Sequence, residues 1–243
     1  MGPHFSEQAF DFLEELEHRN NREWFQENKP VYETELKAPM LEVIAAINTR
    51  LTEFAPDYLR PPPKAMLRIY RDVRFSNDKT PYKTHLAASW PRQGLEKVGG
   101  AGFFLQVGVH GVMVAAGAYS PGSPQLRAIR EYLLDHHDEM RAVLADAALT
   151  RVAEPFDGRP LLRAPRGFDA EHPAADLLRV RSWAHFARLP GDTALRDDFI
   201  DAVVERFRAL APFVDLLNVI LADATPLAVE SSSGRRRAAG SRP

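Results

Sequence analysis

The chain has 243 residues, a formal net charge of -2, 45% hydrophobic residues and no cysteine. This composition is typical of a globular protein with a sizeable core, and the lack of cysteine excludes disulfides, thiolate zinc sites and cysteine nucleophiles. The near-neutral charge gives no argument for nonspecific binding of the whole surface to nucleic acid. Because no apolar run approaches the roughly 20 residues that span a bilayer and no signal-peptide pattern is present, we expect a cytoplasmic protein without membrane contact.

Helices are predicted for the first part of the chain. Ser6 suits the N-cap of a first helix, because its hydroxyl can accept a hydrogen bond from a first-turn amide. A second helix is expected to begin after Asn21. Pro39 is expected to separate a short helical piece at 31–37 from a longer helix at 39–54, since proline is tolerated in the first turn of a helix and not in its interior.

A mostly antiparallel β-sheet of about five strands is predicted for the middle of the chain. Alternating or continuous apolar residues between turn formers indicate the strands, and His110-Gly111 suits a hairpin turn. Strands that follow one another in this way pair most economically as antiparallel neighbours. The expected strands cover residues 66–73, 84–90, 102–109, 112–119 and 182–189.

Further helices are predicted after the hairpin strands. The pair His136-His137 is expected at an exposed helix end, and Pro212 is expected to separate two C-terminal helices. These helices cover residues 124–136, 138–149, 174–178, 195–210 and 212–221.

Together these elements predict a single α+β domain over residues 1–225, with helices from both ends of the chain covering the sheet. Residues 230–243 have no apolar periodicity and are expected to form a disordered basic tail. Its Arg235-Arg236-Arg237 could add phosphate contacts, although most such tails are solvated chain ends.

Charged and aromatic residues are most concentrated between Lys64 and Lys83. Six cations face two carboxylates there, in a chain that is slightly acidic overall. Turn formers at 76–81 predict a loop that carries Lys79 and brings Tyr82 back to the same region. The period-two pattern predicts a polar strand face made of Arg68, Tyr70, Asp72 and Arg74.

This cluster also carries a family resemblance. The stretch Arg68-x-x-Arg71-Asp72-x-Arg74-Phe75-x-x-Asp78-Lys79-x-Pro81-Tyr82-Lys83 resembles the defining motif of a widely distributed bacterial family of unassigned function, with related regions in longer fungal proteins. Asn21-Arg22-x-Trp24-Phe25-x-x-Asn28-Lys29-x-x-Tyr32 supports it. The resemblance covers most of residues 5–221 and implies membership of a domain of unknown function, without assigning a chemistry.

Three hypotheses remain open for the cluster. The first is a site for a phosphate-bearing ligand, a nucleotide or nucleic acid, because arginine binds phosphate through two parallel contacts and tyrosine can stack on a base. The second is an enzyme acting on a phosphorylated or carboxylated small molecule, with Asp72 or Asp78 as the acid/base group and His85 nearby. The third is a structural or interaction domain whose motif is an internal salt-bridge network. The candidate ligand-binding residues are Arg68, Tyr70, Arg71, Asp72, Arg74, Asp78, Lys79, Tyr82 and Lys83.

Common catalytic and cofactor motifs do not occur in the sequence. It contains no HExxH pattern, Walker loop, Gly-x-Ser-x-Gly elbow or dinucleotide fingerprint. We therefore assign no catalytic residue, metal ligand, cofactor or oligomeric state. Trp24 and Phe25 allow two interpretations, a lid over the cluster or the core face of a helix, and the burial preference of aromatic residues favours the core.

Overall fold

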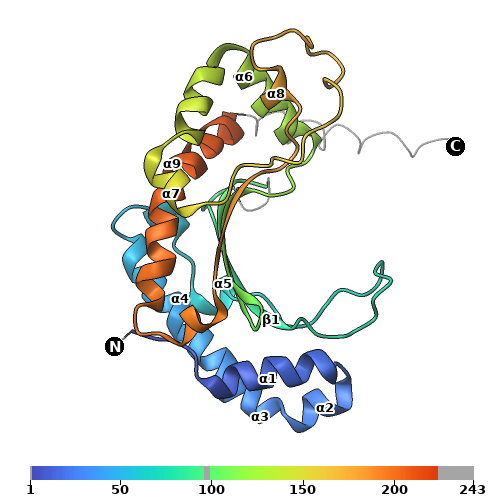
Figure 1. The fold of residues 1–243 in the computed structure, drawn as a ribbon, viewed down its shortest axis with the longest axis vertical. Helices are drawn as coiled ribbons and strands as arrows, with labels where there is room; N and C mark the ends of the chain where they lie inside the picture. The colour runs from blue at the N-terminus through green and yellow to red at the C-terminus, as the bar shows by residue number, and fades with distance from the viewer. Residues whose placement is uncertain (1, 96–98, 224–243) are drawn as a thin grey trace, which may run out of the picture.

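A four-stranded antiparallel sheet with helices packed along one face forms the centre of the protein (Figure 1). The structure is a computed structural model that describes residues 2–95 and 99–223. The other face of the sheet lies on the inner side of a C-shaped molecule (Figure 1). The predicted α+β class, with an antiparallel sheet and helices from both ends of the chain, is confirmed.

One face of the sheet is buried and the other is partly exposed. Its strands β1 (His85–Pro91), β2 (Gly102–Gly108), β3 (Gly111–Ala118) and β4 (Trp183–Leu189) pair in chain order. Leu105 of β2 lies opposite Val114 of β3, and both are fully buried. Their neighbours Phe104 and Met113 are partly exposed. Since side chains alternate along a strand, one face is covered by helices and the other faces the inner side of the C.

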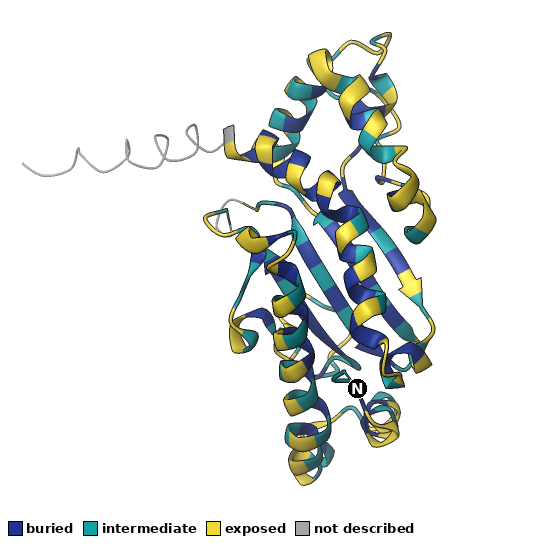
Figure 2. Cartoon of the chain, turned by 90° about the vertical axis from the view of Figure 1, so that its left-hand side faces the viewer, coloured by how far each residue is buried: buried dark blue, intermediate teal, exposed yellow. Residues whose placement is uncertain are grey.

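Two long helices, α4 (Ala38–Leu51) and α9 (Phe199–Asp223), run across the outer face of the sheet with their buried sides toward it (Figure 2). The Phe207 ring of α9 lies 5.5 Å from Trp90 and 4.8 Å from Phe103, measured between centroids. Burying a large apolar side chain in this way contributes roughly 2 kcal/mol to stability. These contacts fix the sheet against the helices, so the side chains on its inner face are held in place from behind.

The predicted division of the C-terminal helix at Pro212 is wrong. Helix α9 continues through this residue without interruption. A proline inside a helix costs about 3 kcal/mol, because it removes a backbone hydrogen bond and crowds the preceding turn. Leu210 and Phe213, on either side of it, are fully buried and hold both halves of the helix on the core. Tertiary burial therefore outweighs the local cost.

The N-terminal helices lie beyond one end of the sheet (Figure 1). They are α1 (Glu7–His18), α2 (Arg22–Glu27), α3 (Lys29–Val31) and the π-helix η1 (Tyr32–Lys37), which leads directly into α4. The Ser6 hydroxyl accepts from the Ala9 amide at 3.3 Å, and Asn21 Oδ1 accepts from the Trp24 amide at 2.9 Å. The predicted cap at Ser6 and the predicted helix start after Asn21 are confirmed.

The predicted break before Pro39 is wrong, because residues 29–51 stay helical throughout. The Ala38 amide donates to the carbonyl of Glu33, five residues back instead of four. This wider π turn makes room for the proline ring, which would otherwise clash with a carbonyl of the preceding α-helical turn.

The remaining helices follow the hairpin strands. They are α6 (Ser123–Leu144), α7 (Ala147–Val152) and α8 (Ala175–Leu178). Short helical turns occur before the sheet, at η2 (Pro56–Tyr58) and α5 (Pro62–Ala65), and after β4, at η3 (Gly191–Leu195). The predicted boundary at His136-His137 is present as a kink: two helical segments of α6 meet at His136, which is exposed and has non-helical backbone angles. His137 is half-buried, and Met140, one turn further, is fully buried and keeps the helix on the core.

One predicted strand, at 66–73, is not part of the sheet. It lies beside β1 but makes isolated bridges, from Met66 to Ala88 and from Tyr70 to Tyr82. Four residues separate Met66 from Tyr70, whereas six separate Tyr82 from Ala88. The two chains therefore cannot keep one register, and no continuous ladder forms. Within the described residues the sheet has four strands instead of about five.

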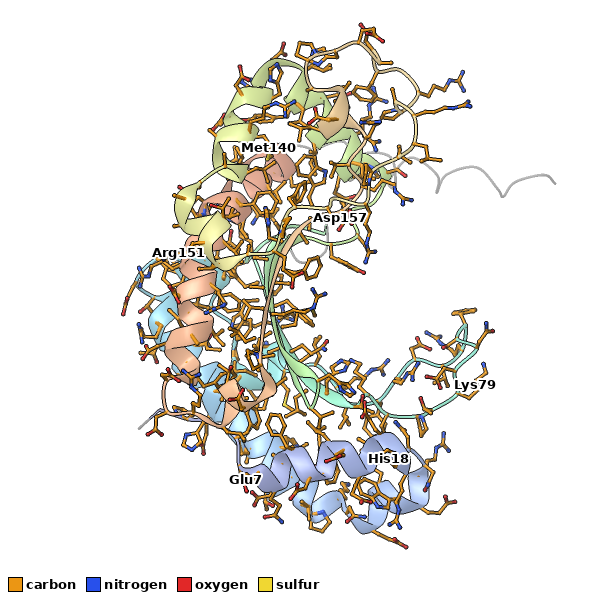
Figure 3. The ribbon with its side chains drawn as sticks, in the orientation of Figure 1. Glu7, His18, Lys79, Met140, Arg151 and Asp157 are labelled. Carbon is orange, nitrogen blue, oxygen red and sulfur yellow. The ribbon has the colours of Figure 1, made fainter. Side chains whose placement is uncertain are left out.

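Residues 66–84 form a hairpin that projects from the sheet on the open side of the C, and we call this hairpin the arm (Figure 1). Lys79 lies on its far part (Figure 3). The predicted alternation persists along the arm, since Ile69 is buried while Arg68 and Tyr70 are exposed. Period-two alternation is a property of extended backbone and does not require a ladder.

A single hydrophobic core joins the helices to the sheet. In the part of the chain that the structure describes, no helix combines the length and apolar character needed to cross a membrane. The predicted disordered tail at 230–243 and its arginines lie outside the described residues.

Candidate functional site

The arm is anchored to the N-terminal helices. The Tyr82 ring stacks on Phe25 of α2, with centroids 4.0 Å apart and planes at 14°. The Asn20 side chain accepts from the Tyr82 amide and donates to the Tyr82 carbonyl, each at 3.0 Å. Trp24 packs at 5.1 Å from Phe12. Phe25 and Tyr82 are both buried, so Phe25 belongs to the core as predicted, and Tyr82 supports the arm.

Arg74 and Asp72 form a two-point ion pair in the outer part of the arm, residues 71–80, which we call the arm tip. Arg74 donates from Nε and Nη2 to the two oxygens of Asp72, at 2.9 and 2.7 Å. The guanidinium carbon also lies 5.7 Å from the ring centroid of Phe75, which is 93% exposed. The pair is thus satisfied locally, although it lies far from the core.

Arg71 and Asp78 form a second ion pair at the arm tip. Asp78 Oδ1 accepts from the Thr80 amide at 2.9 Å and from the Thr80 hydroxyl at 2.8 Å. Lys79 donates from Nζ to the carbonyl of Val73 at 2.9 Å. Each cation of the arm tip therefore has a partner inside the arm itself.

These contacts keep both carboxylates of the arm tip ionised. Hydrogen bonds from the Thr80 amide, and then from Arg71 and the Thr80 hydroxyl, lower the pKa of Asp78 to about 2. The Arg74 guanidinium lowers the pKa of Asp72. A general acid or base works best with a pKa near the working pH. This geometry therefore does not favour Asp72 or Asp78 as the acid/base group of an enzyme at neutral pH.

Where the arm joins β1, three basic groups lie together, and we call them the arm base: Arg68, Lys83 and His85. None of them forms a salt bridge with a described carboxylate, and Asp72, which is paired with Arg74, interacts with Arg68 only at longer range. The Arg68 guanidinium is exposed and makes no hydrogen bond or ion pair with any described residue. Lys83 is half-buried and donates from Nζ to the Arg68 carbonyl at 3.0 Å. His85 shares a strand face with Ser89, which pairs with Phe104, so it faces the inner side of the C.

The arm base is a region of uncompensated positive charge. Burial, and then the charge of Arg68, lower the pKa of Lys83. Burial also lowers the pKa of His85, and Lys83 and Arg71 lower it further. All the charged neighbours that shift these two groups are therefore cations. An anion bound among them would remove their mutual repulsion.

The predicted ligand-binding residues fall into different environments. Arg71, Asp72, Arg74, Asp78 and Lys79 belong to the hydrogen-bonded arm tip, Arg68 and Lys83 meet at the arm base, Tyr82 is buried, and Tyr70 is 47% exposed. Their role in binding a ligand remains a prediction. The structure adds that Arg71 and Arg74 each form a salt bridge with a carboxylate of the arm, whereas Arg68 and Lys83 form none with a described residue.

Two features of this region are not predicted from the sequence as parts of a ligand site. One is His85, which belongs to the arm base. The other is a cavity on the inner face of the sheet, lined by Phe104 of β2 and Phe186 of β4. Strand alternation contains a signal for it, since both rings occupy positions on the face that the helices do not cover. Among the described residues, no group of three or more metal-ligating side chains lies close enough together to hold an ion.

Comparison with known proteins gives a family match over most of the chain. A family model described as conserved hypothetical protein (DUF2461) matches residues 8–216, which include the arm and all four strands. No curated protein and no solved structure matches the chain.

Proposed function

The chain belongs to the DUF2461 family of conserved hypothetical proteins, and we propose that it binds a phosphate-bearing ligand, a nucleotide or nucleic acid, at the arm base. One observation carries this proposal. Lys83 and His85 are half-buried beside Arg68, and the charged groups that shift their pKa values are all cations. A site of this kind is electrostatically incomplete until an anion occupies it.

The donors of the arm base suit phosphate. The Arg68 guanidinium presents N–H groups in a planar fork, which matches two oxygens of a phosphate group. One N–H group of the Lys83 ammonium donates to the Arg68 carbonyl, and the other two can donate to a ligand. His85 adds a donor and a charge when it is protonated. A phosphate group carries about two negative charges at neutral pH, enough to balance Arg68 and Lys83 together.

The arm base is a better anion site than the arm tip. A ligand at the tip would have to displace Asp72 from Arg74 or Asp78 from Arg71, and each exchange gives up a charge-assisted hydrogen bond. A ligand at Arg68 displaces no carboxylate. The net gain on binding is therefore larger at the arm base.

Exposed aromatic rings further along the arm allow an experiment to distinguish binding of a nucleotide from binding of a nucleic acid. Tyr70 is 47% exposed and Phe75 is 93% exposed. Bases of a single strand stack on such rings, and each stacked base contributes about 1–3 kcal/mol. A nucleotide held by its phosphates at the arm base would leave Phe75 free, whereas a longer single strand would cover it. Phe75→Ser should therefore weaken the binding of a strand and leave that of a nucleotide unchanged.

The test is calorimetric titration of the full chain at low salt with three probes: pyrophosphate, ADP and an oligothymidylate. At least one probe should bind, and Arg68→Gln and Lys83→Gln should each weaken it about tenfold or more, the effect of losing a charge-assisted hydrogen bond. Arg74→Gln is the matched control, because it removes a cation from the same arm and should leave affinity within about twofold, as expected for a charge with an internal partner.

Proton linkage gives a second readout. Because burial and nearby cations lower the pKa of His85, the imidazole is neutral at pH 8, and a bound anion favours its protonated form. Affinity should therefore rise as the pH is lowered from about 8 toward 6, and His85→Gln should flatten this dependence. The proposal fails if none of the three probes binds, or if Arg74→Gln is as damaging as Arg68→Gln. A loss of folding in Arg68→Gln, with no probe raising the melting temperature, would favour a structural role instead.

A further inference from the structure

A cavity of about 610 Å³ opens on the inner face of the sheet, where β2, β3 and β4 meet residues 154–159. This volume lies within the range of sites for small molecules. The residues that line it do not include those of the arm base. It is therefore a separate candidate site, and its argument does not rest on the function proposed above.

On the floor of the cavity the strand register places a small side chain between two aromatic ones, and we call the space above the small side chain the slot. Phe104 pairs with Ala115, and Ala115 pairs with Phe186, so the three side chains form a row across β2, β3 and β4. Because neighbouring strands lie about 4.8 Å apart, the two phenylalanines stand about 10 Å apart with the small alanine between them. A planar group resting on Ala115 would lie about 5 Å from each ring, within the range of favourable aromatic contacts.

A guanidinium without a counter-ion stands beside this slot. The Arg159 side chain lies over the Tyr119 ring, 4.4 Å from its centroid, and donates to the Tyr119 hydroxyl. Tyr119 in turn meets Phe186 edge to face, with centroids 6.0 Å apart. Arg159 makes no ion pair with any described residue, whereas Arg188, which also lines the cavity, is neutralised by Glu154.

The backbone holds Arg159 in an unfavourable conformation. Its φ of 47° is the one positive φ among the described non-glycine residues, and such a conformation costs about 1 kcal/mol or more. The Arg181 side chain donates to the Arg159 carbonyl at 3.0 Å, and the amides of Arg181 and Ser182 both donate to the Gly158 carbonyl at 2.9 Å. The chain thus keeps the guanidinium over Tyr119 against a local preference, as is common where a side chain is positioned for a ligand.

Acidic groups at the same cavity limit the charge of the ligand. Asp157 lines it and lies toward the upper end of the inner face (Figure 3). Asp157 makes no ion pair with any described residue, and Glu154 is shared with Arg188. A doubly charged phosphate would be repelled by these carboxylates, whereas a single carboxylate can be satisfied by Arg159 alone.

We propose that this cavity binds a small aromatic carboxylate, with its ring on Ala115 between Phe104 and Phe186 and its carboxylate on Arg159. The aromatic side chains supply most of the affinity through apolar burial. Arg159 selects the charged end through a hydrogen-bonded ion pair.

The test is calorimetric titration of the full chain with 2-naphthoate, 2-naphthol and 2-naphthyl phosphate, which share one ring system and differ in charge. We expect 2-naphthoate to bind most tightly, and 2-naphthol to bind at least about tenfold more weakly, since it lacks the partner for Arg159. Ala115→Leu fills the slot and should abolish binding. Arg159→Gln should reduce 2-naphthoate affinity about tenfold or more.

Two control variants test whether the effect on 2-naphthoate affinity is specific to the residues of this cavity. Arg163→Gln removes an exposed arginine of the same segment that does not line the cavity, and it should leave 2-naphthoate affinity unchanged. Arg68→Gln should also leave it unchanged, since the arm base is a different site. Circular dichroism and the melting temperature establish that each variant is folded. The proposal is overturned if no probe binds, if 2-naphthol or 2-naphthyl phosphate binds as tightly as 2-naphthoate, if binding survives in Ala115→Leu, or if Arg159→Gln binds 2-naphthoate as tightly as the wild type.

Discussion

Acidification is expected to destabilise the protein through one buried histidine, His185. Its ring lies between those of Phe156 and Phe213, with centroids 4.9 Å from each, and the residue is 2% exposed. Neither ring nitrogen makes a hydrogen bond of ordinary geometry with a described residue, although the backbone of Glu154 lies close to the ring. Burial disfavours the charged imidazolium and lowers the pKa of His185 to about 4, and the contact with the Glu154 backbone opposes this shift only in part.

The size of the effect follows from the two pKa values. In the unfolded chain His185 binds a proton near pH 6.5, whereas in the folded protein it stays neutral down to about pH 4. Within this window the unfolded state holds one more proton, so the free energy of unfolding falls as the pH is lowered. A difference of roughly 2.5 pKa units, at about 1.4 kcal/mol for each unit, corresponds to between about 3 and 4 kcal/mol, of which about 3 kcal/mol is lost between pH 7 and pH 4. Above pH 6.5 and below pH 4 this residue contributes no further pH dependence.

Urea unfolding of the wild type and of His185→Leu across this pH range measures the effect. Carboxylates and the other histidines titrate in both proteins and cancel in the comparison, so the variant should lose about 3 kcal/mol less stability than the wild type between pH 7 and pH 4. His18→Gln serves as the control and should follow the wild type, because His18 is exposed and its side chain makes no ion pair with a described residue. Parallel loss of stability in the wild type and His185→Leu would refute the reasoning.

Two substitutions and one control should test the packing of the sheet by urea unfolding. Asn218→Ala removes the side chain that accepts from the Ala101 amide at 2.9 Å and donates to the Ala101 carbonyl at 3.1 Å, and leaving these buried groups unpaired should cost about 3 kcal/mol. Val219→Ala, at an exposed position of the same helix, should cost less than about 1 kcal/mol, and equal losses would contradict the argument. Gly117→Ala should cost at least about 2 kcal/mol, because φ is +124° and a Cβ would lie 2.1 Å from the Trp183 carbonyl oxygen. Near-wild-type stability of this variant would show that the strand can shift there.

Local signals predicted much of the secondary structure. The cap at Ser6 is present, and the strand expected at 182–189 appears as β4. Such features depend on neighbouring residues alone, so periodicity and capping are sufficient to find them. The helix breaks predicted at Pro39 and Pro212 are absent, because a change of helical turn or burial against the core overcomes the local signal.

The candidate site was predicted less completely. The sequence identified the charged hairpin and its alternation, but it could not show that Arg71 and Arg74 have carboxylate partners while Arg68 has none. Pairing of charges depends on side-chain geometry at distances of a few ångströms, which residue spacing does not specify. His85 belongs to the site because the hairpin and β1 meet at that point.

What the sequence by itself determined is the α+β class, the antiparallel order of the strands, membership of a family of unassigned function, and the location of the charge cluster at 64–83. Each of these follows from composition, periodicity or a contiguous motif. Only the tertiary structure decided that 66–73 leaves the sheet, that positive charge remains uncompensated at the arm base, and that Phe104 and Phe186 flank a cavity. The physical reason is that strand register, the pairing of charges and the space between side chains depend on which distant residues meet, and burial of the whole core settles that choice.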